Sequence, residues 1–212
     1  MSQNKKTDLL LAIFITVLIC ANILGVKITT ILGISVSVGI FMFPITFLIT
    51  DIIEEVHGKE KTKTFIKAGS IALIIVFAYT ALSIWLGASE RYPHGEAYAT
   101  IFGSTLRMLF ASLIAFLISQ YHDIWAFNFW KTKTKGKYLW LRNNASTVVS
   151  QLLDSTIFMF IAFYAIAPKF DALFIIQLII PYWLFKIVIA AIDTPFCYLG
   201  VKWLKGTKSG KK

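Results

Sequence analysis

The sequence predicts an all-α polytopic membrane protein with six transmembrane helices, oriented with the N-terminus and the C-terminus inside. Of its 212 residues, 57% are hydrophobic and only 15% are charged, whereas about a quarter of the residues in a soluble domain are charged. The apolar residues gather in runs of about twenty, the length that a helix needs to cross a bilayer core of ~30 Å. The alternating ten-residue segments of a membrane β-barrel are absent from the sequence.

Six apolar runs define the expected spans, which we assign to a single domain covering residues 1–212. The first run follows Lys5 and Lys6 and has no small-residue cleavage site, so it predicts an uncleaved helix and not a signal peptide. Pro44 should perturb the second span, Pro181 should start the membrane part of the sixth, and Pro195 should kink it. The spans are expected at about 9–28, 34–53, 66–86, 101–121, 145–167 and 178–201.

The links between these runs differ in length and in charge. Residues 29–33 are a short link, 54–67 a charged one, 87–98 a polar loop and 168–171 a turn. The longest link, 122–144, combines Trp125 and Trp130 with alternating lysines, and it is expected at the level of the lipid headgroups. Cys20 and Cys197 lie inside apolar runs, which argues against a disulfide framework.

The distribution of positive charge predicts the orientation. With the N-terminus inside, sixteen of the 21 lysines and arginines fall in the inner segments, as the positive-inside rule requires. A formal net charge of +10 is also typical of proteins that bind nucleic acid. Here the charges flank the spans, so we expect no direct nucleic-acid partner and interpret them as anchors to the bilayer.

Apart from Lys27 and Lys67, which lie at span ends, five charged residues lie within the expected spans and are the strongest functional signal. A charge that faces lipid costs at least a few kcal/mol, so five of them in a small bundle should converge on one internal polar site. The alternative is that they form ion pairs, such as Arg107 with Asp154, which only hold helices together. The five residues are Asp51, Arg107, Asp154, Lys186 and Asp193.

Other patterns argue against an enzyme and against a cofactor. Glu54-x-x-His57 has the spacing of half a di-iron carboxylate site, but the matching half is missing, so a solvated helix end is the better interpretation. His122 and Asp123 are likewise interpreted as an interfacial pair. The sequence has no phosphate-binding P-loop, no H-E-x-x-H and no G-x-S-x-G. No metal or cofactor is therefore expected.

Several motifs together resemble one family. Phe43-Pro44-x-x-Phe47-Leu48-x-Thr50-Asp51 is similar to the signature of the queuosine-precursor transporter family of inner-membrane proteins. The resemblance continues in chain order over nearly the whole sequence, although the polar loop before the fourth span shows no clear match. The further motifs are Arg107-Met108, Gln120 with Asp123, Ala145-Ser146-Thr147, Asp154-Ser155-Thr156, Phe185-Lys186 and Asp193-Thr194-Pro195.

The resemblance implies that the chain imports deazaguanine bases, such as queuine, across the cytoplasmic membrane for tRNA modification. A guanine-like base presents adjacent N–H donors, which a carboxylate can accept side by side, and Asp154 is the preferred candidate for that contact. The other candidates for substrate binding are Arg107, Lys186 or Gln120 toward the ring carbonyl, Phe47, Phe43 or Trp183 over the ring face, Asp51 or Asp193 toward an aminomethyl cation, and Asn22 in the first span.

Two other function classes and the energy source stay open. The chain could be the substrate-binding subunit of a multi-protein ATP-driven importer, or an intramembrane enzyme that acts on a lipid or an isoprenoid. Transport could be facilitated diffusion or coupled to protons through a carboxylate. The expected partners are a small purine-like base and the bilayer, and the sequence leaves a homo-oligomer open.

Overall fold

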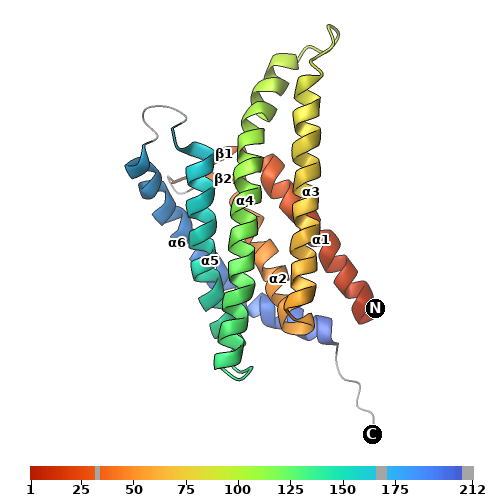
Figure 1. Cartoon of the computed structure of the whole chain (residues 1–212), viewed down its shortest axis with the longest axis vertical. Coiled ribbons are helices and arrows are strands. Elements are labelled where there is room, and N and C mark those ends of the chain that lie inside the picture. The colour runs from red at the N-terminus through yellow and green to blue at the C-terminus, as the bar shows by residue number, and fades with distance from the viewer. Residues whose placement is uncertain (32–33, 166–170, 207–212) are drawn as a thin grey trace.

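The computed structural model describes residues 1–31, 34–165 and 171–206, and across these residues it is almost entirely helical. Figure 1 shows α3, α4 and α5 side by side and nearly upright, with α1 crossing obliquely behind them. The six α-helices are α1 (Gln3–Leu24), α2 (Phe43–His57), α3 (Lys59–Trp85), α4 (Gly95–Lys133), α5 (Leu139–Phe163) and α6 (Ala172–Lys205). This confirms the predicted all-α membrane fold.

Five of these helices are long and apolar enough to cross a membrane, and α2 is the exception among the described elements. It has 15 residues, which rise only ~22 Å. The predicted second span at 34–53 is therefore wrong in its first part. Residues Ile28–Ile31 (β1) and Ile34–Ser37 (β2) pair as antiparallel strands, and Val38–Phe41 forms a 3₁₀ turn, η1.

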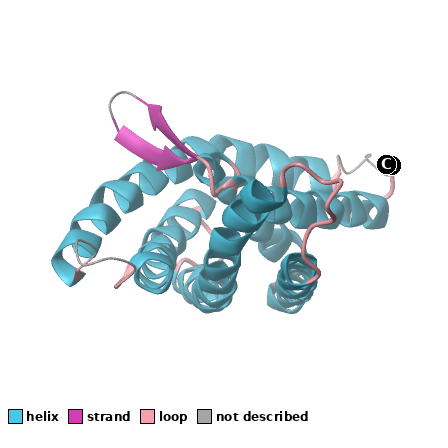
Figure 2. Ribbon diagram, turned by 90° about the horizontal axis from the view of Figure 1, so that it is seen from above, coloured by secondary structure: helices cyan, strands magenta, loops and turns pink. Residues whose placement is uncertain are grey.

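Local chemistry explains why this segment is not a helix. Residues 28–38 are mostly isoleucine, threonine, valine and serine, and β-branched residues favour strands. Ser37 donates a hydrogen bond to the Gly25 carbonyl at 2.5 Å, which ties the hairpin to the end of α1. Figure 2, seen from above, places the hairpin at the edge of the bundle.

Pro44 and Pro181 act differently from the prediction, whereas the kink expected at Pro195 stays a prediction. Pro44 lies in the first turn of α2, where the backbone N–H needs no helical partner, so it helps to start the helix and does not perturb it. Pro181 and Pro195 both lie inside α6, which begins earlier, at Ala172. Asp171 caps that start by accepting a hydrogen bond from the Phe174 N–H at 2.8 Å.

The expected link at 122–144 is largely helical. α4 continues through the aromatic run to Lys133, which gives it 39 residues, and α5 begins at Leu139. The connection between them is a tight turn in which Lys135, Gly136 and Tyr138 all have positive φ. The expected end of the fifth span at 166–167 and most of the turn at 168–171 lie outside the described residues.

Aromatic packing joins α1, α3 and α4 at the core. The ring of Phe14 lies 5.9 Å from Phe65 and 6.2 Å from Phe116, measured between centroids, and all three side chains are buried. The start of α1 also lies against the end of α6, since Lys6 donates a hydrogen bond to the Trp203 carbonyl. These two helix ends therefore share one side of the molecule.

Candidate functional site

A polar face of α5 organises the interior of the bundle. Four buried polar residues repeat at intervals of four, which is slightly more than one helical turn. At 1.5 Å per residue, this face extends about 18 Å along the helix axis. Its members are Arg142, Ser146, Ser150 and Asp154.

Asp154 forms a buried ion pair with Lys186 of α6. The Lys186 Nζ lies 2.7 Å from Asp154 Oδ2, and the Ser119 hydroxyl of α4 donates to Oδ1 at 3.3 Å. The lysine ammonium also lies over two aromatic rings, 5.7 Å from the centroid of Phe43 and 5.5 Å from that of Tyr182. Each charge thus has an opposite charge and further polar or aromatic partners, the condition under which ionised groups persist in a protein interior.

A small cavity, which we name the Asp154 cavity, adjoins this pair. It measures about 30 Å³, close to the volume of one water molecule and far below the 300–1,000 Å³ typical of ligand pockets. The structure is therefore closed around the ion pair. Its polar and aromatic lining consists of Asn22, Ser37, Phe43, Ser112, Phe158, Tyr182, Asp154 and Lys186.

A second small space, the Asp51 cavity, lies on the other side of Lys186, which lines both. This cavity measures about 10 Å³. Its walls come from α2, α5 and α6, so the three helices meet there. The lining includes Phe47, Asp51, Asn143, Thr147, Gln151, Lys186 and Asp193.

Many polar atoms in this interior have no hydrogen-bonding partner among the residues that the structure describes. Both amide atoms of Gln120 are buried and unpaired, as are Asp51 Oδ1 and Gln151 Oε1. A buried unpaired group costs about 1–3 kcal/mol, and lipid cannot satisfy it. Such a concentration of unpaired donors and acceptors is typical of a binding site. The further unpaired atoms near the Asp51 cavity are Asn143 Oδ1, Thr147 Oγ1 and Asp123 Oδ1.

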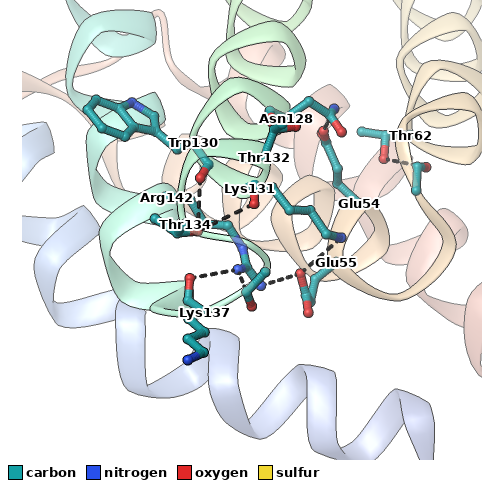
Figure 3. Close-up of polar contacts among 12 residues, drawn as sticks. Glu54, Glu55, Thr62, Asn128, Trp130, Lys131, Thr132, Thr134, Lys137 and Arg142 are labelled. Atoms are coloured by element: carbon teal, nitrogen blue, oxygen red, sulfur yellow. Dashed lines mark hydrogen bonds and ion pairs between the residues drawn. The ribbon is translucent and has the colours of Figure 1, made fainter.

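An ion network closes the bundle at the end of the α5 polar face that is opposite Asp154. Figure 3 shows Arg142 of α5 and Lys131 of α4 pointing at Glu55 of α2. The Arg142 Nη2 and Lys131 Nζ lie 2.5 and 3.2 Å from Glu55 Oε2, and Lys205 lies 3.5 Å from Oε1. Arg142 also donates to the Gly136 carbonyl at 2.8 Å. One carboxylate therefore joins four helices.

The structure brings most of the sequence-predicted site residues together, in two groups. Asp154, Lys186, Asn22 and Phe43 line the Asp154 cavity, and Asp51, Phe47, Asp193 and Lys186 line the Asp51 cavity. Gln120 is buried on α4, the helix that also carries the Asp154 partner Ser119.

Two of the predicted residues lie elsewhere. Arg107 is exposed and donates to the Ile161 and Tyr164 carbonyls at 2.9 and 2.8 Å, so it caps the end of α5 and does not pair with Asp154. A cation is attracted to that position by the negative end of the helix dipole. Trp183 donates through Nε1 to the Val148 carbonyl at 2.8 Å and lines neither cavity.

Sequence reasoning missed other residues of the interior. Asp123 was assigned to an interface but is buried, and Arg142 was counted as a surface anchor although it is 1% exposed. Asn143, Thr147 and Gln151 follow one another at intervals of four, which is the one signal that would have identified this second polar row. Glu54 and His57, once considered as half of a metal site, contact Asn128 and Thr7 respectively.

Comparison with known proteins gives consistent matches. Residues 37–200 match the family described as "Putative vitamin uptake transporter". The chain is 31% identical over 188 residues to the probable queuosine precursor transporter of Bacillus subtilis (strain 168), covering 88% of this chain and 80% of that protein. It is 27% identical over 192 residues to the queuosine precursor transporter of Escherichia coli (strain K12), covering 90% and 84%.

No solved structure matches the chain. The family match covers more than half of the sequence and includes α2 to α5 with most of α6, the helices that carry Asp51, Asp154 and Lys186. Its relatives are named as transporters, which agrees with an interior that is rich in polar groups. The protein is a multi-pass membrane transporter and belongs to the vitamin uptake transporter family.

Proposed function

We propose that this protein imports queuosine precursors, deazaguanine bases such as queuine, across the cytoplasmic membrane. The names of the two relatives support the substrate class. The single observation that carries the proposal is the buried interior around Asp154 and Lys186, with unpaired amide groups beside charged ones. A planar base with several N–H donors and one ring carbonyl matches that mixture of donors and acceptors.

The base is expected to replace the bond between Asp154 and Lys186. Asp154 would accept two adjacent N–H groups of the base, while the Lys186 ammonium would donate to its carbonyl. Phe43 and Tyr182, which already lie near the lysine ammonium, are placed to cover the ring face. Because the Asp154 cavity holds only about 30 Å³, binding requires α5 and α6 to separate there.

Transport by alternating access follows from the two closed regions. The Asp154 cavity lies toward the hairpin, since Ser37 and Gly25 line it, and the Glu55 network closes the opposite end. With both termini in the cytoplasm, as the positive charges favour, the hairpin end faces outward. A base would enter near the hairpin, bind between the two regions and leave after the Glu55 network opens.

An ATP-driven importer with this chain as its binding subunit is the competing function. Purified protein in liposomes, without any partner, separates the two: uptake of labelled queuine supports a self-sufficient transporter. Binding without uptake would overturn that part of the proposal. Competition by queuine, its nitrile and amine precursors and guanine would rank the substrates.

The base contact is tested by Asp154→Asn, with Asp171→Asn as a matched carboxylate-to-amide control. Asp171 caps α6 and is exposed, so its substitution should leave affinity unchanged. A hydrogen bond to a charged group contributes about 1.5–3 kcal/mol, so Asp154→Asn should weaken queuine binding roughly 10- to 150-fold. Unchanged affinity in Asp154→Asn would contradict the assignment.

A further inference from the structure

Two acidic side chains meet in the middle of the bundle and take no part in the base contact. Asp51 of α2 and Asp123 of α4 are 2% and 1% exposed, and their carboxyl groups lie within hydrogen-bonding reach of each other. Two carboxylates in contact repel strongly, and a hydrogen bond between them requires a proton on one. The pair is therefore a ready-made place for one proton.

The charged groups around the pair do not neutralise it. Glu54 on α2 and Asp193 on α6 add negative charge. Lys186 shares the Asp51 cavity, but its ammonium is bonded to Asp154, and Arg142 is bonded to Glu55. Among the described residues, none of the ion pairs involves Asp51 or Asp123. The nearby cations are thus bonded to other carboxylates, and a proton is left to neutralise the Asp51–Asp123 pair.

A chain of polar groups connects the pair toward both sides of the bundle. Ser150 of α5 contacts the Asp123 carboxyl, and its hydroxyl lies 2.9 Å from Nδ1 of His122, which is half-exposed. On the other side, Asp51 shares its cavity with Asp193, which is also only half-buried. Side chains that can pass a proton therefore extend from a half-exposed histidine to a half-exposed aspartate.

The pair is also positioned to respond to the substrate. Ser150 precedes Asp154 by one turn of α5, and Lys186 lines the Asp51 cavity as well as the Asp154 cavity. While a base occupies Asp154, its carbonyl holds the Lys186 ammonium away from Asp51, so the pair keeps its proton. When the base leaves, the ammonium loses that partner and is free to turn toward Asp51. A cation next to Asp51 favours the ionised form of the pair, so the proton would be released after the base and on the same side of the membrane.

We propose that the Asp51–Asp123 pair is a proton-binding site that couples import of the base to proton entry. One proton would enter with each base, and the proton passes between the two carboxyl groups and the Ser150–His122 side, with one O–H or N–H bond broken and one formed at each transfer. This inference rests on the proposed function, and it assigns to that function an energy source that the sequence left open.

The test uses purified full-length protein in liposomes with the membrane potential clamped at zero. An inward gradient of one pH unit should concentrate labelled queuine about tenfold inside at one proton per base, and an uncoupler should abolish this. Asp123→Asn should lose the accumulation but still exchange internal for external queuine, since exchange needs no net proton movement. Glu60→Gln, an exposed carboxyl outside the pair, serves as the matched control and should accumulate normally.

The outcomes separate the two proposals. If the wild type exchanges queuine but only equalises its concentration, or accumulates it only with a sodium gradient, proton coupling is overturned and the proposed function stands. Accumulation by Asp123→Asn at the wild-type level would also overturn it. If the wild type shows no exchange, the proposed function fails, and the coupling inference falls with it.

A second measurement does not depend on any variant. Dicyclohexylcarbodiimide adds to protonated carboxyl groups in apolar surroundings, so treatment of the wild type at neutral pH should modify Asp51 or Asp123. Peptide mass spectrometry would locate the adduct. A protein labelled on neither residue would contradict the presence of a proton there.

Discussion

The ion pair between Asp154 and Lys186 gives the sharpest prediction about stability. At 2.7 Å and an effective dielectric constant of about 20, the Coulomb attraction is about 6 kcal/mol. Much of this attraction only offsets the loss of hydration, because both side chains are at most 9% exposed. Lys186→Met would keep the apolar stem but leave the Asp154 charge without its partner. We expect it to lower the free energy of unfolding by about 3–5 kcal/mol.

Equilibrium unfolding in detergent, followed by circular dichroism, measures this loss. The double variant Asp154→Leu, Lys186→Met removes both charges, so it should recover most of the stability, as replaced buried pairs often do. Lys205→Met is the control, because Lys205 is half-exposed at 3.5 Å from Glu55, and should cost less than about 1 kcal/mol. If Lys186→Met stayed within 1 kcal/mol of the wild type, the reasoning would be refuted. It would also be refuted if the double variant lost as much stability as Lys186→Met and Asp154→Leu lose together.

Three further predictions concern the elements around the site. Gly39→Ala should lower the free energy of unfolding by about 1–3 kcal/mol, because the added Cβ would lie 2.7 Å from the Ala21 carbonyl oxygen; wild-type stability would show that η1 can shift away. Arg142→Lys should be less stable than the wild type in the same unfolding assay, because a lysine ammonium cannot reproduce the planar arrangement in which Arg142 bonds Glu55 and two carbonyls. Wild-type stability of this variant would contradict the prediction. Trp183→Phe should cost about 1 kcal/mol through the lost hydrogen bond to a carbonyl of α5, and a thermal scan that shows no shift would argue against that bond.

The fold class was predictable because it depends on composition. The structure of the expected second span depends instead on whether its residues prefer a strand or a helical conformation. Runs of about twenty apolar residues allow few structures in lipid, and the helices appear where those runs lie. Residues 34–42 are as apolar as a helix would require. Their β-branched side chains and the Ser37 bond to Gly25 favour the hairpin, and hydropathy alone does not register either effect.

The candidate site was predictable to the extent that charge in an apolar run is conspicuous. Asp154 and Lys186 are isolated charges in such runs, and they do pair. Asp123 was missed because it lies next to the apparent end of an apolar run, where a solvated position was the simpler interpretation. Helix α4 continues past that point, which buries it. Arg107 shows the opposite error, since a charge inside a run can bind the carbonyls of a neighbouring helix end.

The short helix α2 has a consequence for how the protein is made. Its 15 residues carry Asp51, Glu54 and Glu55, so on its own it is a poor candidate for recognition by the insertion machinery. It packs most extensively against α6, which is synthesised after the other five described helices. The surroundings of the α2 carboxyl groups are therefore incomplete until α6 has been made. Assembly of the interior is a late, post-insertion event, and a ribosome stalled before Ala172 should hold α2 in a state that proteases can reach.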